Sequence, residues 1–207
     1  MIIKGIDISK WQKNVNFGIL KDVDEVQFVI LKAGGSDKGC YTDPTFHTRY
    51  EECKKHGIAV GAYYFVGKLC DSAADGYADA VRFLHIIEGK QFEYPVYIDF
   101  EAPSKADREG NTEACIAFCD YMESRGYYVG IYASDVSGFK ERLNISKLAS
   151  YDKWVARYGK QPEFVQAYGM WQCSSKGLFA GIDGNVDCDV SLKDYPAIMK
   201  KAHLNGF

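Results

Sequence analysis

The sequence predicts a single α/β domain: an irregular, TIM-like (β/α)5(β)3 barrel with eight strands and a catalytic face at the strand C-termini. Two observations lead to this fold class. Over most of the chain, apolar β-prone segments alternate with segments of helical spacing. In the last third, consecutive strands lie only about nine residues apart, whereas a helical crossover between parallel strands takes roughly a dozen residues or more. The last three strands should therefore be joined by loops or hairpins.

Length and composition fit one well-cored globular domain over residues 1–207. Of the 207 residues, 47% are hydrophobic and 14% aromatic. The formal net charge of −3 offers no basic footprint for nucleic acid or an anionic membrane. No apolar run approaches the ~20 residues of a transmembrane helix, and no signal-peptide pattern opens the chain. We expect synthesis in the cytoplasm, with neither nucleic acid nor a membrane as partner.

The first unit begins with an apolar strand over residues 2–9, which carries Asp7 near its end. A short helix is expected over residues 16–24. Residues 26–35 are almost continuously apolar and end in two glycines, which predicts a second buried strand followed by a turn.

A helix with Pro44 near its start is expected over residues 44–56. Gly57 follows as a C-terminal stop signal. Residues 58–67, with aromatic residues at their centre, then predict the third strand.

The next long helix is expected over residues 72–87, ending at Gly89. It leads to a fourth strand over residues 94–101. A further amphipathic helix over residues 112–125 stops at Gly126.

The remaining strands are expected over residues 127–134, 153–158, 168–174 and 185–190. A helix over residues 136–150 completes the fifth strand–helix unit. The last strand should close the barrel beside the first.

Two carboxylates at the end of the fourth strand are the strongest chemical signal. Asp99 and Glu101 are one residue apart, so both should project to the same face as Tyr97, with α-carbons roughly 6.5–7 Å apart. Burying two acids together costs desolvation and repulsion without stabilising the fold. The alternative is that each is salt-bridged or caps the next helix, although a cap explains one acid better than two.

Two further acids should reach the same end of the barrel. Asp7 ends the first strand and Asp187 lies in the last one. Because parallel strands present their C-termini on one face, Asp7, Asp99, Glu101 and Asp187 should surround one cavity. Asp189 can join them or be solvated.

Aromatic and amide side chains occur at the same strand ends. Rings suit the apolar face of a sugar, while acids and amides suit its hydroxyls; for any single ring the alternative is core filling. Lys32 can contact substrate or merely neutralise the acids. The candidate substrate-binding residues are Lys32, Tyr63, Phe65, Tyr132, Trp154, Trp171 and Gln172.

We expect neither a metal nor another cofactor. An acid cluster can hold a divalent cation, but no histidine ligand set or phosphate-binding loop accompanies this one. The seven cysteines are odd in number and have no C-x-x-C spacing, which favours free thiols packed as small apolar groups.

Seven segments resemble, in order and with fitting spacing, the signatures of glycoside hydrolase family 25. They are GIDISKWQ at residues 5–12, GAYYF at 61–65, YPVYIDFE at 94–101, GIYAS at 130–134, WVARY at 154–158, WQ at 171–172 and GIDGNVD at 181–187. The family comprises lysozymes of the N-acetylmuramidase type, common as phage endolysins and bacterial autolysins. Phe100, where a smaller aliphatic residue is usual, and Asp189, where Asn is common, depart from the pattern.

The resemblance implies a (β/α)5(β)3 barrel that hydrolyses the β-1,4 bond between N-acetylmuramic acid and N-acetylglucosamine. It implies Glu101 as general acid, Asp99 as the acid that assists the acetamido group or stabilises the intermediate, and Asp7 and Asp187 as supporting acids. Neighbouring carboxylates and partial burial should raise the pKa of Glu101, as an acid catalyst needs near neutral pH.

The expected partner is bacterial peptidoglycan, reached after release or export, and the expected state is a monomer. A wall-binding domain can follow Phe207 in a longer protein. Two alternatives remain: a chitinase-like hydrolase, whose longer D-x-x-D-x-D-x-E series is missing here, and a non-catalytic wall-binding barrel, which would be expected to lack some of the four acids.

Overall fold

The computed structural model describes residues 3–207, so the predicted strand start at Ile2 lies outside the described part. Eight strands form a closed barrel, in the order β1, β9, β8, β7, β6, β5, β4, β2, with β2 pairing back to β1. A ninth, β3, is added at the edge of β2. The strands are β1 (Ile3–Ile8), β2 (Phe28–Gly35), β3 (Tyr41–Thr42), β4 (Ala59–Phe65), β5 (Val96–Asp99), β6 (Val129–Ser134), β7 (Asp152–Ala156), β8 (Met170–Phe179) and β9 (Ile182–Ser191).

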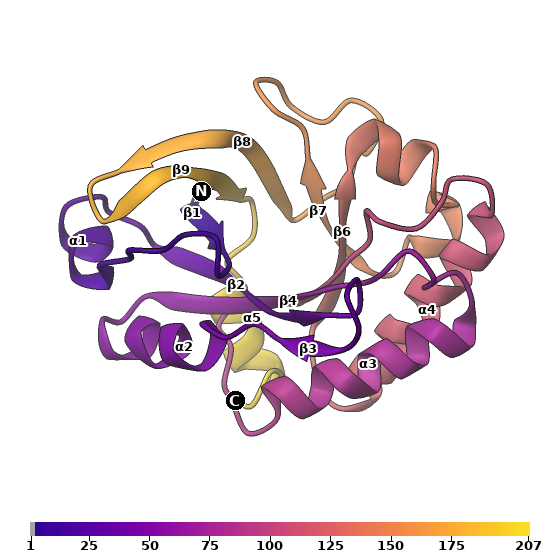
Figure 1. Ribbon diagram of the computed structural model, residues 1–207, viewed down its shortest axis with the longest axis horizontal. Coiled ribbons are helices and arrows are strands. Elements are labelled where there is room, and N and C mark those ends of the chain that lie inside the picture. The colour runs from indigo at the N-terminus through magenta and orange to yellow at the C-terminus, as the bar shows by residue number, and fades with distance from the viewer. Residues whose placement is uncertain (1–2) are drawn as a thin grey trace.

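Helices cover only part of this barrel. Figure 1 shows α2, α3 and α4 along one side and the β8–β9 hairpin, without a covering helix, on the other. The α-helices are α1 (Phe17–Asp22), α2 (Phe46–Lys55), α3 (Ala73–Ile87), α4 (Arg108–Ser124) and α5 (Tyr195–Ala202). The predicted fold class, an irregular TIM-like barrel with a helix-poor last third, is confirmed.

The direction of β9 differs from that of its neighbours. It runs antiparallel to both β8 and β1, whereas β7 and β8 are parallel and joined by a loop. The predicted loop and hairpin connections are therefore confirmed. Because β9 is reversed, it supplies Asp187 from within the strand, directly opposite Asp7 of β1, rather than from a C-terminal end.

The structure corrects several predicted segments. The helix expected over residues 136–150 is instead a π-helical turn, Asp135–Lys140, followed by a 3-10 turn, Ile145–Leu148. Helix α4 begins at Arg108, earlier than predicted, because the Asp107 side chain accepts a hydrogen bond from the Gly110 N–H and caps it.

Two elements were not predicted. Strand β3 has only two residues and pairs with Gly34 and Gly35, too short a segment for a periodic pattern. Helix α5 begins at an Asp194 cap, and Tyr195 on it packs against Tyr94, with ring centroids 5.3 Å apart. It closes the barrel at the end away from the acids.

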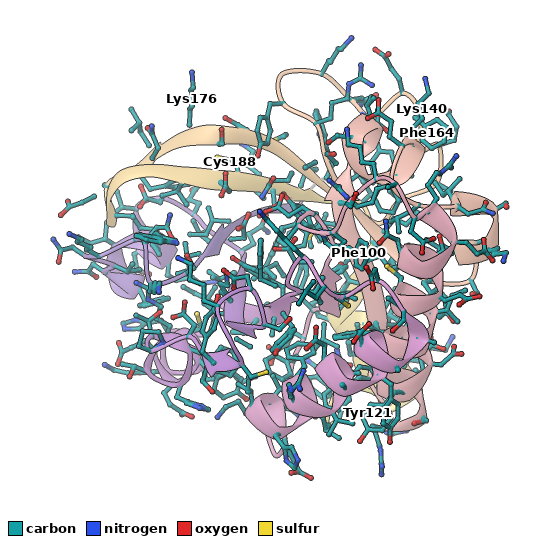
Figure 2. All side chains as sticks on the ribbon, turned by 45° about the vertical axis from the view of Figure 1, so that its right-hand side comes forward. Phe100, Tyr121, Lys140, Phe164, Lys176 and Cys188 are labelled. Atoms are coloured by element: carbon teal, nitrogen blue, oxygen red, sulfur yellow. The ribbon has the colours of Figure 1, made fainter. Side chains whose placement is uncertain are left out.

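The structure has two hydrophobic cores, one between the barrel and the helices and one inside the barrel. Between the barrel and the helices lies the larger core, which includes the fully buried Phe100 (Figure 2). Inside the barrel, Phe28 stacks on Tyr94 at 4.2 Å between centroids. A Cβ on Gly5 would meet the Phe28 ring at 2.5 Å, so glycine is required there. The filled interior leaves the strand ends above it as the place for a site.

Candidate active site

A cavity of about 300 Å³ opens above the packed barrel interior. All four predicted acids line it, as do six of the seven predicted substrate-binding residues. The lining residues are Asp7, Ile8, Ser9, Trp11, Gln12, Lys32, Tyr63, Phe65, Asp99, Glu101, Tyr132, Trp154, Tyr158, Gln172 and Asp187.

The strand register brings the acids together. Asp7 on β1 pairs with Asp187 on β9. Asp99, the last residue of β5, lies between Phe65 of β4 and Tyr132 of β6. Glu101 was expected inside the fourth strand, but that strand ends at Asp99, so Glu101 extends from the following loop. It is exposed at the cavity mouth, while Asp99 is buried.

Trp171 is the predicted site residue that the structure places elsewhere. It is absent from the cavity lining, and its Nε1 donates a hydrogen bond to the Arg157 carbonyl at 2.7 Å. Neighbouring residues on a strand face opposite sides, so Trp171 and Gln172 cannot both point inward. Of the two residues predicted for the site, the structure brings Gln172 into the cavity and not Trp171.

Sequence reasoning missed Trp11, Gln12 and Tyr158 as lining residues. The first two lie in the segment after the first strand, whose course the strand pattern does not predict. Tyr158 was expected at the end of the strand over residues 153–158, on the same face as Trp154, but β7 ends at Ala156. Trp11 is 71% exposed and is positioned to present its ring to a bound ligand. Lys10 Nζ lies 5.3 Å from the centroid of that ring.

A hydrogen-bond network orients Gln172 and Asp7. The Tyr132 hydroxyl donates to Gln172 Oε1 at 2.8 Å, and the Tyr158 hydroxyl donates to the same atom at 3.1 Å. With Oε1 accepting twice, Gln172 Nε2 faces Asp7 and donates to its Oδ2 at 2.7 Å. The network fixes Asp7 as an acceptor beside the cavity.

Asp189 is buried beneath the lining rather than solvated. It is 2% exposed, and Trp154 Nε1 donates to its Oδ1 at 2.8 Å. Since Asp189 pairs with Gly5 while Asp187 pairs with Asp7, the two β9 acids are stacked along the inner face of the barrel. The alternative of a solvated Asp189 is therefore wrong.

Glu101 is only partly shielded from water at the cavity mouth, and this partial desolvation raises its pKa, although Arg142 and Lys32 act against it. The direction agrees with the expectation, but the cause differs in part, because neighbouring carboxylates are not among the effects that raise it. Arg142 lies in the segment mispredicted as a helix, so no sequence pattern indicated it. The pKa of Asp99 is raised well above its usual range, first by burial and then by the charge of Glu101.

Lys32 lies among aromatic rings at the edge of the acids. Its Nζ is 4.3 Å from the Phe65 ring centroid and 5.8 Å from that of Tyr63. Burial lowers the pKa of Lys32, while Asp99 opposes the shift more than any other acid. Over residues 3–207 no carboxylate lies close enough to Lys32 Nζ to form an ion pair, so it contributes charge to the cavity as a whole.

In residues 3–207, no three His, Cys, Asp or Glu side chains are grouped as metal ligands. None of the described helices has the length and hydropathy needed to cross a bilayer. All seven cysteines are free thiols in the structure.

Comparisons with known proteins agree on one family. The family model described as Glycosyl hydrolases family 25 matches residues 6–182. The autolytic lysozyme of Clostridium acetobutylicum is 29% identical over 188 residues, which cover 90% of this chain. This chain spans only 55% of that relative's length.

Solved structures give the same result. The CTP1L endolysin superposes with a TM-score of 0.83 at 29% identity, covering 96% of this chain and 70% of that one. The modular autolysin LytC of Streptococcus pneumoniae, solved with a synthetic peptidoglycan ligand, superposes with a TM-score of 0.79 at 26% identity. That match covers 91% of this chain and 46% of LytC.

Proposed function

Because this chain belongs to glycosyl hydrolases family 25, we propose that it is a lysozyme of the N-acetylmuramidase type. Its reaction is hydrolysis of the β-1,4 bond between N-acetylmuramic acid and N-acetylglucosamine in bacterial peptidoglycan. The substrate lies outside the membrane, so the protein acts on the wall after release or export, as a monomer.

Glu101 is the proposed general acid. Its place at the mouth of the cavity lets it reach a glycosidic oxygen, and its pKa is shifted upward, which is the direction that a general acid requires. Protonation of the leaving oxygen then allows the C–O bond to break toward a cationic sugar.

Asp99 is the proposed assisting acid. It faces the same cavity from two residues earlier in the chain, and its Oδ1 has no hydrogen-bond partner among the described residues. A substrate N–H or a developing positive charge can satisfy that oxygen. Asp7 and Asp187 are the proposed supporting acids of the pocket. The proposed sugar-binding residues are Tyr63, Phe65, Tyr132, Trp154 and Gln172.

The observation that carries the proposal is the joint lining of one cavity by Asp99, Glu101, aromatic rings and an oriented amide. Acids at this position with no metal ligand set among residues 3–207 suit proton transfer to a glycoside. The observation favours an enzyme over a non-catalytic wall-binding barrel.

The test is cleavage of purified cell walls, followed by reducing-end analysis of the products. Turbidity should fall, and the new reducing ends should be N-acetylmuramic acid. Chitin oligomers serve as the alternative substrate. Glu101→Gln should lose about 10²–10⁴-fold in activity or more, because general acid catalysis contributes that much. Near wild-type cleavage by this variant would remove Glu101 from its proposed role.

A further inference from the structure

Asp189 carries a hydrogen-bonding arrangement that the proposed reaction does not use. It lies on β9 inside the barrel, is 2% exposed, and accepts one hydrogen bond, from Trp154 Nε1 to its Oδ1 at 2.8 Å. Its second oxygen, Oδ2, is buried and receives no hydrogen bond from a described donor. A buried carboxylate oxygen without a donor is costly if the group is charged.

Another acid lies beside Asp189. Because Asp189 pairs with Gly5 and Asp187 pairs with Asp7 across the β1–β9 ladder, Asp189 and Asp7 are diagonal neighbours on the same inner face of the barrel. Asp7 is 6% exposed and already accepts from Gln172 Nε2 at 2.7 Å. Two ionised carboxylates so placed would repel each other strongly away from water, and an ionised pair has no proton to form a hydrogen bond.

We infer that Asp189 holds a proton and donates it in a hydrogen bond to Asp7, so that Asp189 is a positioning residue for the cavity acid above it. In this arrangement Trp154 donates to Asp189, Asp189 donates to Asp7, and Gln172 donates to the other oxygen of Asp7. The chain gives Asp7 a fixed orientation beneath the substrate. The positioning role of Asp189 rests on the proposed function, but the presence of a proton on its carboxyl does not.

The hydrogen bond from Trp154 favours the charged form of Asp189, but burial and the neighbouring titratable groups favour the protonated form. Its titratable neighbours all carry negative charge when ionised, and none of those that the structure describes is a cation. Burial, followed by the charge of Asp7, raises the pKa of Asp189 well above its usual range. The neighbours are Asp7 on β1, Tyr97 on β5, Tyr158 after β7, Cys173 on β8, and Asp187 and Cys188 on β9.

Two substitutions of Asp189 distinguish a role as a neutral hydrogen-bond donor from a role as a negative charge. Asp189→Asn has the shape of a protonated carboxyl: its oxygen can accept from Trp154 and its NH2 can donate to Asp7. Asp189→Leu has similar size and can make neither bond. We expect Leu to lower kcat/KM by about 10-fold or more and to move the acid limb of the pH profile upward, because Asp7 loses a donor that favours its charged form.

Asp189→Asn should retain activity within about threefold of wild type. The acid limb of its pH profile should match that of wild type. If Asp189→Asn loses as much activity as Asp189→Leu, the negative charge is needed and the inference is wrong. If both variants match wild type, Asp189 has no positioning role, and the inference is wrong again.

The protonation state of Asp189 can be measured independently of enzyme activity. In protein with 13C-labelled Asp carboxyls, the resonance that disappears in Asp189→Asn belongs to Asp189. It should stay at the shift of a protonated acid from about pH 5 to about pH 8. An ionised shift over that range would overturn the inference even in an active enzyme. A protonated Asp189 in a protein that does not cleave walls would leave the inference standing and refute the proposed function.

Discussion

At the scale of single residues, the proposed chemistry depends on acids whose environments differ although they share a cavity. Glu101 is at the mouth and Asp99 is 5% exposed. The sequence correctly predicted that both acids line one cavity, but Asp99 ends β5 and Glu101 lies in the loop after it, so strand alternation positions only Asp99. Arg142 beside Glu101 and the burial of Asp189 had no such signal. The position of Arg142 depends on the path of a loop, and the burial of Asp189 depends on the reversed direction of β9.

Asp99→Asn should impair wall cleavage by about 10²-fold or more while preserving the fold, because an amide cannot ionise beside the positive charge that develops on the sugar. The free energy of unfolding should be equal or slightly higher, since one buried acid is lost from a crowded cluster. Initial rates of wall cleavage and a denaturant titration check both parts. Substantial activity with Asn at this position would exclude an essential charge on Asp99.

The raised pKa of Asp7 predicts that the stability of the protein depends on pH. Burial, followed by the charge of Asp187, raises the pKa of Asp7 to about 8. Between the unfolded pKa of about 4 and this value the folded state binds the extra proton, so Asp7 makes stability fall as pH rises. The slope from one such group is at most ~1.4 kcal/mol per pH unit.

Asp7→Asn should flatten that slope and make the protein more stable than wild type at about pH 8. Denaturant titrations between about pH 4 and about pH 8 measure it. The exposed Asp22→Asn is the matched control and should leave the slope unchanged. Identical slopes in wild type and Asp7→Asn would mean that Asp7 does not bind the extra proton.

At the scale of elements, the π-helical turn Asp135–Lys140 anchors the loop between β7 and β8. Asp135 is 1% exposed and accepts hydrogen bonds from the backbone N–H groups of Glu163, Phe164 and Val165. Arg157 completes its surroundings with an ion pair. The loop so held also carries Tyr158, which donates to Gln172 in the cavity.

Asp135→Asn should destabilise the protein by about 2–3 kcal/mol, because the buried charge is lost and the NH2 faces other donors. Burial opposes ionisation, but the backbone N–H groups outweigh it and lower the pKa of Asp135. Its contribution is therefore present above the unfolded pKa near 4 and lost as pH falls through the folded value.

Denaturant titrations at neutral and acid pH check this prediction. Glu163→Gln is the control: its side chain is 64% exposed and also pairs with Arg157, so the change should stay within about 0.5 kcal/mol. An equal loss from both variants would show that the ion pairs, not the backbone contacts, hold the loop.

The same segment marks where sequence reasoning failed. Residues 136–150 have helical composition, but a π-helical and a 3-10 turn form instead, because the backbone contacts to Asp135 come from a loop distant in sequence. In contrast, α3 begins one residue after its predicted start at Ser72, whose side chain accepts a hydrogen bond from the Asp75 N–H. The sequence therefore predicted the helix that is set by local contacts, but not the segment whose conformation depends on contacts with a distant loop.

At the scale of the whole molecule, the filled barrel supplies the stability, so the thiols are not needed as cross-links. Cys53, Cys70, Cys115 and Cys119 are buried and pack as apolar groups. Mass analysis after alkylation in denaturant should find all seven cysteines modified without reduction. Two or more intact disulfides in protein purified without oxidant would contradict this.

The pairing of β1 with β9 has a consequence for the making of the protein. Asp7 and Asp187 come from opposite ends of the chain and meet only when this last ladder forms. Closing so long a loop is a late and slow step in folding. A nascent chain still lacking β9 on the ribosome has neither an intact pocket nor a closed barrel. The four-acid pocket therefore cannot assemble before β9 has been synthesised and has paired with β1.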